Sequence, residues 1–149
     1  MTQQKNSVTC AVAIIDPSHC VLLVHPSGST FHQGWSLPKG VGQCDETPQV
    51  TACREVFEET GLRLDTELLV DHGRFPYTRE KDYHMFSIKV PGATDVKHLV
   101  CTSTFINKRG CEIPEVDKFT WVLLNKAPEY LNPKQASIFT QCFLGVSTQ

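Results

Sequence analysis

The hydrophobic pattern begins with two short apolar runs. Residues 8–15 form a nearly continuous, β-branched run, and residues 21–24 form a second one. Short apolar runs of this kind predict buried strands. Residues 16–18 between them are Asp-Pro-Ser, which favours a turn. The start of the chain is therefore predicted to be a frayed tail over residues 1–6, then a strand, a turn and a return strand.

Later segments continue the alternation of strands with polar connections. Residues 83–90 alternate between apolar and polar positions, which is typical of a strand with one buried face. Stretches rich in glycine, proline and polar residues predict the connections. Further strands are expected to start at residue 68 and to lie over residues 96–105 and 119–124, with loops or turns over residues 26–34, 73–82 and 107–110 and a short helical turn over residues 128–131.

A first helix is predicted between Thr47 and Gly61. Thr47 can serve as its N-cap, and Pro48 suits the first helical position, where a missing N–H is harmless. Gly61 is a natural C-terminal stop. Apolar residues recur along this helix at spacings that favour a core-facing stripe. That predicted stripe consists of Val50, Cys53, Val56 and Phe57.

A second helix is predicted near the end of the chain. Asn132 can serve as its N-cap, and Pro133 would occupy the first helical position. Strands interleaved with two helices predict an α/β or α+β sandwich. Residues 1–149 are expected to form a single domain, because this length is enough to bury one core. The stripe of the second helix is predicted to comprise Ile138, Phe139, Cys142, Phe143 and Val146.

Negative charge gathers on the first helix. Glu55, Glu58 and Glu59 are helical neighbours, so they share a face on which like charges repel. They also lie in the last turns, where the helix dipole favours cations, and only Arg54 is within local reach of Glu58. A hard divalent cation with oxygen ligands, Mg²⁺ or Mn²⁺, would resolve this repulsion. A solvated acidic helix face is the alternative.

The full pattern around this helix is more specific than the acidic cluster. Gly40 is followed after five residues by Glu46, and after seven more by the run REVFEETGL over residues 54–62. This pattern resembles the Nudix box at every defining position. The resemblance implies a Nudix hydrolase fold, in which a mixed β-sheet is flanked by helices. In style the chain is similar to members that act on diadenosine polyphosphates or ADP-ribose.

The resemblance also implies roles for the residues of the box. In the family, the helix glutamates bind divalent metal and activate a water molecule that attacks phosphorus. Glu55, Glu58 and Glu59 are therefore expected to be metal-binding and catalytic carboxylates, with Glu55 as the first candidate for the base. Arg54 is expected to orient them and to pair with Glu46.

Two further metal ligands are expected outside the helix. The family often uses the backbone carbonyl just before the first glycine of the box, which here belongs to Lys39. Relatives also commonly carry a glutamate in a loop ahead of a strand similar to residues 119–122, FTWV. Glu115 is the candidate for that position, and Glu112 is the alternative.

Substrate recognition is expected beside the box and in the segment after the first helix. Lys39 could reach a substrate phosphate or could be an ordinary surface lysine, and Arg74, Tyr77 and Lys81 are candidates for contacts with the nucleotide. In the family, a tyrosine at about this distance from the box is associated with diadenosine polyphosphate hydrolases and a proline with ADP-ribose pyrophosphatases. Pro76 and Tyr77 are adjacent here, so this marker decides for neither class. A solvated hairpin loop is the alternative.

Composition limits the classes of partner. The chain is 40% hydrophobic and 20% charged with a formal net charge of −2, which argues against a dedicated nucleic-acid binder. The polar amino-terminal residues do not resemble a signal peptide, and no apolar run approaches the ~20 residues of a membrane span. The seven cysteines are odd in number and lack CxxC spacing. They predict free thiols in a reducing cytoplasm.

The predicted function is that of a Mg²⁺- or Mn²⁺-dependent pyrophosphohydrolase. Its expected substrates are small molecules linked to a nucleoside diphosphate, such as dinucleoside polyphosphates and ADP-ribose. A nucleoside triphosphate, the 5′ triphosphate end of an RNA, and a catalytically silent nucleotide-binding domain are the alternatives. The sequence is compatible with a homodimer and gives no reason to expect a membrane partner.

Overall fold

The computed structural model describes residues 7–145, and its main feature is a mixed β-sheet. The strand order is β4–β5–β1–β2–β8, with β3 paired to β1. The β1–β5 pair is parallel and the other pairs of this sheet are antiparallel. The strands of the sheet are β1 (Ser7–Ile15), β2 (Cys20–Pro26), β3 (Lys39–Val41), β4 (Val70–Pro76), β5 (Lys81–Lys89) and β8 (Val116–Leu123).

Strand β1 is buried on both faces and forms the centre of the core. Its side chains alternate between two clusters: Ala11 and Ala13 belong to one, and Val12 and Ile14 belong to the other. The alternation follows from the two-residue period of side chains along a strand. The continuous apolar run in the sequence is therefore a strand covered on both sides, as predicted.

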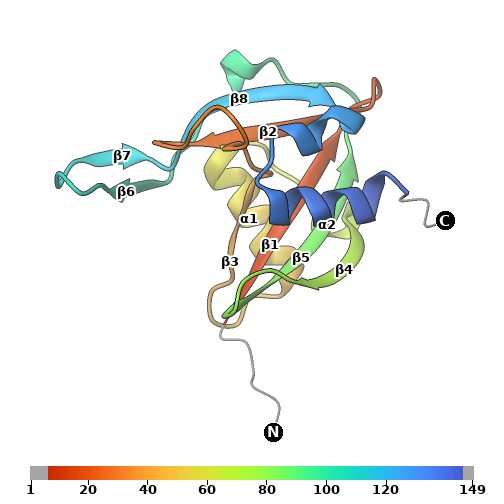
Figure 1. Ribbon diagram of the computed structural model, residues 1–149, viewed down its shortest axis with the longest axis horizontal. Helices are drawn as coiled ribbons and strands as arrows, with labels where there is room; N and C mark the ends of the chain where they lie inside the picture. The colour runs from red at the N-terminus through yellow and green to blue at the C-terminus, as the bar shows by residue number, and fades with distance from the viewer. Residues whose placement is uncertain (1–6, 146–149) are drawn as a thin grey trace, which may run out of the picture.

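The two α-helices cover opposite faces of the sheet (Figure 1). Helix α1 (Pro48–Thr60) packs against the cluster of Val12, and helix α2 (Pro133–Phe143) packs against the cluster of Ala11. This arrangement is the α+β sandwich that the sequence predicts. Short 3₁₀ helices complete the fold: η1 (Thr66–Leu68), η2 (Val96–His98) and η3 (Leu124–Glu129).

The sheet divides where β1 separates from β2. These two strands pair only at Ile15 and Val21. Farther along, β3 takes the place beside β1, so that Lys39 pairs with Ala11. The chain between β2 and β3 crosses this gap, because Ser36 is bridged to Val24 of β2 before β3 begins. The gap brings the start of the Nudix-like pattern beside α1.

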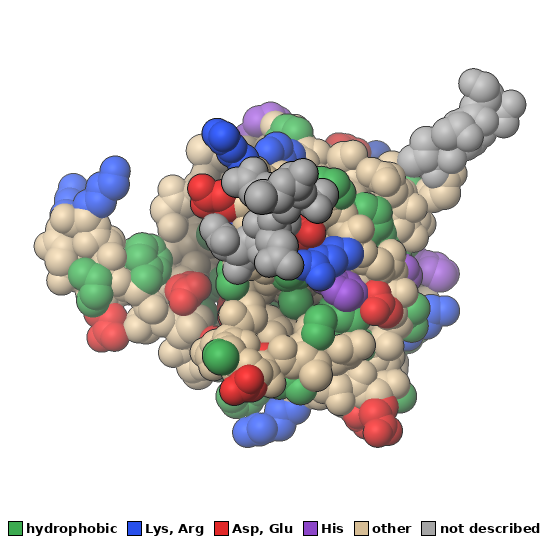
Figure 2. All heavy atoms as spheres, turned by 90° about the horizontal axis from the view of Figure 1, so that it is seen from below, with side chains coloured by type: hydrophobic (Ala, Val, Ile, Leu, Met, Phe, Trp, Pro, Cys, Tyr) green, Lys and Arg blue, Asp and Glu red, His purple; other side chains and the backbone are tan. Residues whose placement is uncertain are grey.

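A hairpin made of β6 (Thr104–Ile106) and β7 (Glu112–Pro114) stands away from the body of the molecule (Figure 1). Figure 2 shows the same projection from below, with Lys and Arg side chains near its end. The predicted turn over residues 107–110 closes this hairpin. The second strand ends directly before Glu115, so the hairpin leads the chain back to the sheet.

Three predicted segments differ from the structure. The strand expected over residues 96–105 is wrong: 3₁₀ helix η2 occupies its start, and only residues from Thr104 onward are extended in a ladder. The strand expected from residue 68 begins at Val70, after η1. The loop expected over residues 73–82 is largely strand, because β4 runs to Pro76 and β5 starts at Lys81. Apolar content without a partner strand does not make a strand.

The predicted apolar stripe of α1 is only partly correct. Val56 is buried, but Val50 is exposed, and Cys53 and Phe57 are half-buried. Phe57 instead lies under the guanidinium of Arg63, whose central carbon is 4.4 Å from the ring centroid. The helix is turned so that small residues approach the sheet and a glutamate shares the buried face. That face consists of Thr51, Ala52, Val56, Glu59 and Thr60.

The stripe of α2 follows the prediction within the described residues. Ile138 and Phe139 are buried, and Cys142 and Phe143 pack against the same cluster. Val146 and the tail over residues 1–6 lie outside the described residues. The cysteines are free, as predicted. Within residues 7–145, none of the helices has the length and apolar character needed to cross a membrane.

Candidate active site

Helix α1 begins and ends where the sequence predicts. The Thr47 side chain accepts a hydrogen bond from the backbone N–H of Val50 at 3.2 Å, and Pro48 occupies the first turn. Gly61 adopts a left-handed conformation with φ of 83°, and its N–H donates to the Phe57 carbonyl at 2.8 Å. Only glycine adopts this conformation without strain. These caps fix the helical register of the three glutamates.

Arg54 is the centre of the ion pairs on α1. Its Nε and Nη2 donate to the two carboxylate oxygens of Glu46 at 2.7 and 3.0 Å, which is a bidentate pair. Its Nη1 donates to Glu55 at 3.0 Å and to Glu58 at 3.3 Å. The predicted pairing of Arg54 with Glu46 is confirmed. Hydrogen bonds from Arg54 hold the pKa of Glu46 low, at about 2.

Glu59 is the most deeply buried of the three glutamates. It is 6% exposed, and burial followed by the charge of Glu55 raises its pKa to about 8. The backbone N–H of Lys39 opposes this shift, since it donates to Glu59 Oε1 at 3.3 Å. Burial also raises the pKa of Glu55. A buried and a half-buried carboxyl group therefore interact on this face of α1, and each disfavours ionisation of the other.

Gly40 allows Glu55 to approach the backbone. A Cβ atom at residue 40 would lie 2.0 Å from the carboxyl carbon of Glu55, which is far inside contact distance. Gly40 pairs with Cys10 in the β1–β3 ladder, so its backbone cannot easily move away. The first glycine of the pattern is thus required by the position of the Glu55 carboxylate.

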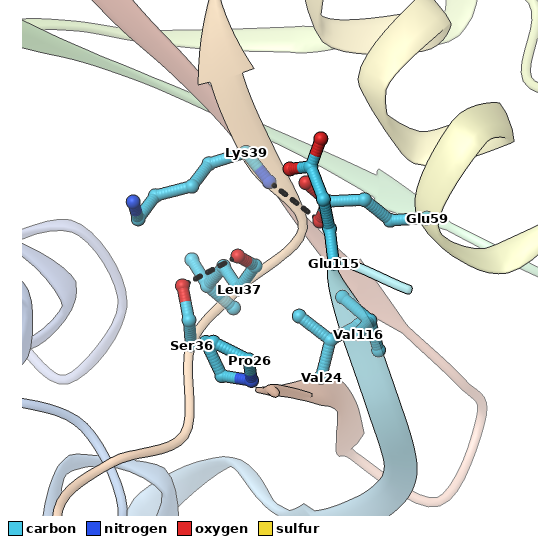
Figure 3. A pocket seen from close by; sticks show the side chains of 8 residues that line it. All are labelled: Val24, Pro26, Ser36, Leu37, Lys39, Glu59, Glu115 and Val116. Carbon is cyan, nitrogen blue, oxygen red and sulfur yellow. Dashed lines mark hydrogen bonds between the residues drawn. The ribbon is translucent and has the colours of Figure 1, made fainter. Parts of the chain in front are cut away.

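A cavity of about 150 Å³ opens beside these carboxylates (Figure 3). Glu59 reaches it from α1 and Glu115 from the bend between β7 and β8, and the charge of Glu115 contributes to the raised pKa values of Glu55 and Glu59. Glu112 lies instead in the projecting hairpin, where it accepts a hydrogen bond from Thr104 at 2.8 Å. The cavity is lined by Val24, Pro26, Ser36, Leu37, Lys39, Glu59, Glu115 and Val116.

The backbone and the side chain of Lys39 point to different places. The backbone contacts Glu59, whereas the side chain points away from both glutamates (Figure 3). Its ammonium nitrogen lies 5.9 Å from the ring centroid of Tyr77. This division follows from the pairing of Lys39 with Ala11, whose side chain faces α2.

The predicted nucleotide contacts lie around the β4–β5 turn. Tyr77 packs edge-on against Tyr83, with ring centroids 4.9 Å apart, and is partly buried. Arg74 pairs with Asp82 at 3.2 Å and remains half-exposed. Lys81 begins β5. The structure brings Tyr77 and the Lys39 side chain together, while Arg74 and Lys81 lie at the two sides of the same turn.

Gln135 is a residue of this region that the sequence reasoning missed. It is fully buried on α2 and contacts Leu37 and Ser36, which line the cavity. A signal was available in the sequence. Gln135 lies three and four positions before Ile138 and Phe139, so it is a polar residue on the apolar stripe of an amphipathic helix.

The acidic side chains are not already arranged as the ligands of a metal ion. Among residues 7–145, no three His, Cys, Asp or Glu side chains converge closely enough to hold a metal ion. Arg54 instead engages Glu55 and Glu58 through hydrogen bonds. Oxygen donors, burial and surplus negative charge nevertheless suit a hard divalent cation. Such an ion would compete with Arg54 for these carboxylates.

Comparison with known sequences gives a consistent result. The family model for the NUDIX domain matches residues 5–142. An uncharacterized 17.7 kDa protein of Enterobacteria phage T4 is 33% identical over 120 residues, which cover 78% of this chain and 79% of the phage protein. A MutT-like protein of Streptomyces ambofaciens is 51% identical over 35 residues, 24% of this chain and 23% of that protein.

Solved structures share the fold at low sequence identity. The dihydroneopterin triphosphate pyrophosphohydrolase of E. coli has a TM-score of 0.69 at 17% identity, with 93% of this chain and 96% of that chain covered. The NUDIX domain of Shewanella oneidensis NrtR, complexed with ADP ribose, has a TM-score of 0.65 at 17% identity, with coverage of 95% and 87%. A MutT/nudix family protein from Enterococcus faecalis has a TM-score of 0.67 at 16% identity; 97% of this chain is covered but only 63% of that chain.

Proposed function

The chain belongs to the Nudix family, and on that premise we propose that it is a Mg²⁺- or Mn²⁺-dependent pyrophosphohydrolase of nucleoside-diphosphate-linked substrates. One observation carries the proposal: α1 places the buried Glu59 and the half-buried Glu55 in one acidic cluster, and Glu59 lines a cavity that Glu115 also lines. A protein gains nothing in stability from burying like charges in this way. A cation and a phosphate substrate explain the arrangement.

We assign the metal to the carboxylates around the cavity. Glu55, Glu58 and Glu59 would supply oxygen donors from α1, Glu115 would supply one from the bend just before β8, and the Lys39 carbonyl is the backbone candidate. The raised pKa values of Glu55 and Glu59 support this assignment, because a bound cation favours the ionised forms. When bound, Mg²⁺ or Mn²⁺ neutralises phosphate charge and lowers the pKa of a water molecule.

Three residues of the site have further proposed roles in catalysis. Glu55 is the first candidate to accept the proton of the attacking water, because burial raises its pKa toward that of a useful general base. Arg54 orients Glu55 and Glu58 through its hydrogen bonds to both. Gly40 leaves the space that the Glu55 carboxylate occupies.

Dinucleoside polyphosphates and ADP-ribose are the proposed substrates. Support comes from the cavity lined by Glu59 and Glu115 and from Tyr77, which presents an aromatic ring near the Lys39 ammonium. We propose Lys39, Arg74, Tyr77 and Lys81 as nucleotide contacts. The NrtR domain, whose structure contains ADP ribose, has a similar fold. The E. coli protein of similar fold is a dihydroneopterin triphosphate pyrophosphohydrolase. Nucleoside triphosphates are the second candidate class.

The proposal extends to the setting of the enzyme. We propose that residues 1–149 form one catalytic domain, since the family match extends over residues 5–142. Free thiols support a reducing, cytoplasmic location. A homodimer and action on an RNA 5′ end remain predictions without a contact in the described residues that favours them.

A panel assay tests the substrate class. Phosphate or nucleotide release is measured with diadenosine polyphosphates, ADP-ribose, nucleoside triphosphates and a 5′-triphosphorylated RNA, each with Mg²⁺, with Mn²⁺ and with EDTA. We expect metal-dependent release of nucleoside monophosphate from the dinucleotides or ADP-ribose. A folded protein that binds these nucleotides but hydrolyses no substrate of the panel would instead be a silent binding domain.

Thermal melting tests the metal separately from the chemistry. A ligand present at about 100 times its Kd stabilises the native state by about 2.7 kcal/mol, which corresponds to a rise in Tm of roughly 5–10 °C for a domain of this size. We expect millimolar Mg²⁺ or Mn²⁺ to give such a rise relative to EDTA. NaCl at matched ionic strength is the control, and an equal Tm in all three buffers would contradict the metal assignment.

A further inference from the structure

The segment between β2 and β3 carries the backbone of the candidate active site across the gap in the sheet. At its start, Ser36 exchanges backbone hydrogen bonds with Val24 of β2. At its end, the Pro38 carbonyl accepts from the N–H of Val12 in β1. Leu37 lies at the crossing point, where neither strand offers its backbone N–H an acceptor. A buried N–H without an acceptor would be strongly unfavourable.

Gln135 supplies that acceptor from the other side of the sheet. Its Oε1 accepts from the Leu37 N–H at 3.1 Å and from the Tyr83 hydroxyl at 2.7 Å. Its Nε2 donates to the Ser36 hydroxyl oxygen at 3.3 Å, and that hydroxyl donates to the Leu37 carbonyl at 2.7 Å. Gln135 and Leu37 are both 0% exposed. Both the oxygen and the nitrogen of the Gln135 amide therefore have hydrogen-bond partners. Two of these partners, Leu37 and Ser36, belong to the segment, so the amide fixes the segment in place.

The position of this segment determines where two carboxylates lie. Two residues after Leu37, the Lys39 N–H donates to Glu59. One residue later, Gly40 packs directly against the carboxyl group of Glu55. A shift of the segment along or across the sheet would move both contacts. The Leu37–Gln135 bond is the side-chain contact that fixes the segment between its two backbone ladders.

We propose that Gln135 is a positioning residue of the active site: from the opposite face of the sheet, it sets the register of residues 36–40 and thereby the Glu55 and Glu59 carboxylates. Gln135 itself does not line the cavity. The inference rests on the proposed function for its effect on catalysis, while its effect on the segment is independent of any ligand.

Metal affinity of a variant gives the main test. Gln135→Met keeps an unbranched side chain of similar length but removes the acceptor for Leu37. Loss of a residue that orients metal ligands typically weakens metal affinity by about 10- to 100-fold. We expect Mn²⁺ binding, followed by electron paramagnetic resonance, to weaken by about 10-fold or more, and kcat to fall with little change in KM.

Tyr83→Phe is the matched control. It removes the other hydrogen bond to the same Gln135 oxygen but leaves the Leu37 bond in place. We expect this variant to lose stability while Mn²⁺ affinity stays within about twofold of the wild type. If both variants weaken Mn²⁺ binding equally, Gln135 acts only through general stability and the positioning role is wrong.

Hydrogen exchange of the wild-type protein without metal gives a test that needs no variant. We expect the Leu37 amide to exchange as slowly as the amides of the neighbouring ladders, because Gln135 protects it. Exchange at the rate of an unprotected amide would overturn the inference, even if Gln135→Met failed to fold. A wild type that bound no Mn²⁺ but protected Leu37 would overturn the metal proposal and leave the positioning of the segment intact.

Discussion

The two α-helices cover opposite faces of the same strand, and each buries a polar side chain. The hydrogen-bond partners and charges around these two side chains differ. Both start alike, with a capping side chain and a proline in the first turn. Helix α1 buries Glu59, which has one backbone donor at 3.3 Å and the charge of Glu55 beside it. Helix α2 buries Gln135, whose amide bonds Leu37, Tyr83 and Ser36.

The difference separates two uses of a buried polar side chain. Gln135 is neutral and its polar atoms have partners, so its burial is compatible with a stable core. Glu59 carries a raised pKa because its surroundings do not compensate its charge. A group kept in this condition is typical of a functional site. The α2 side therefore supports the sheet, and the α1 side has the uncompensated charge that the proposed metal site requires.

The largest effect is expected for Glu55→Gln on α1. The substitution keeps the shape and nearly the helix propensity of the side chain, but it removes a charge and the ability to accept a proton. We expect hydrolysis to fall by at least ~10²-fold while the fold survives, measured by steady-state kinetics beside thermal melting.

Glu67→Gln is the matched control for Glu55→Gln, because Glu67 is exposed in η1 and bonded to none of the site. It should leave turnover unchanged. Full activity in a well-folded Glu55→Gln protein would mean that the base lies elsewhere.

Gly40→Ala tests whether the backbone approach to Glu55 matters as much as Glu55 itself. The added Cβ would overlap the Glu55 carboxyl group. Because a misplacement of about 1 Å can reduce turnover by about 10²-fold, we expect a loss of that order in kcat. Gly92→Ala is the control, since a Cβ there meets nothing within 4 Å. Equal kcat for both alanine variants would show that the Glu55 position is not critical.

The buried Glu59 of α1 should make the free energy of unfolding depend on pH, whereas the neutral Gln135 of α2 should not. The pKa of Glu59 is about 8 in the folded protein against 4.5 as the ordinary value. Below about pH 4.5 both states hold the proton, but between these values only the folded state does. The free energy of unfolding therefore falls as pH rises, by at most about 1.4 kcal/mol per pH unit.

Chemical denaturation without divalent metal, at pH 5 to pH 8, measures this slope. Glu59→Gln has no proton to lose, so its stability should depend less on pH than that of the wild type. Glu67→Gln should retain the wild-type slope. If the free energy of unfolding has the same pH dependence in the wild type and in Glu59→Gln, Glu59 is ionised in the folded protein. Glu59 and Gln135 would then not differ in the way proposed here.

Removal of a helix cap should have the smallest effect on stability. The two N-caps can be compared directly, because both helices begin in the same way. Thr47→Ala removes the acceptor of the Val50 N–H, and Asn132→Ala removes the acceptor of the Gln135 N–H. Each should lower the free energy of unfolding by about 1 kcal/mol, measured by denaturant titration. Thr47→Ser and Asn132→Asp should restore most of it. We expect neither alanine variant to change kcat, and a large kcat loss in Thr47→Ala at full stability would connect capping to catalysis.

Much of the local structure could be predicted because it depends on neighbours in the chain. Thr47, Pro48 and Gly61 act through backbone groups within four residues, so the bounds of α1 follow from the sequence. The Arg54–Glu46 pair was predicted only through the family resemblance, since these residues are eight positions apart across a loop and a helix start.

The orientation of α1 could not be predicted from its own residues. The apolar positions favoured Val50 and Phe57 as core, whereas the helix buries Ala52, Val56 and Glu59. The outcome depends on the surface that the sheet offers, with Val12 and Ile14 on one side and the gap between β1 and β2 on the other. A pattern within one helix contains no information about that surface.

From the sequence alone we could predict both α-helices, the strand pair at the start of the chain, the spacing of Glu55, Glu58 and Glu59, and membership of a family with a known type of site. Each of these depends on residues close together in the chain or on a contiguous pattern. Three features became evident only from the folded structure: Glu115 rather than Glu112 reaches the cavity, Glu59 is buried, and Gln135 binds Leu37 from the opposite face. These contacts join residues far apart in sequence, and they form only when packing brings β8 and α2 to the gap in the sheet.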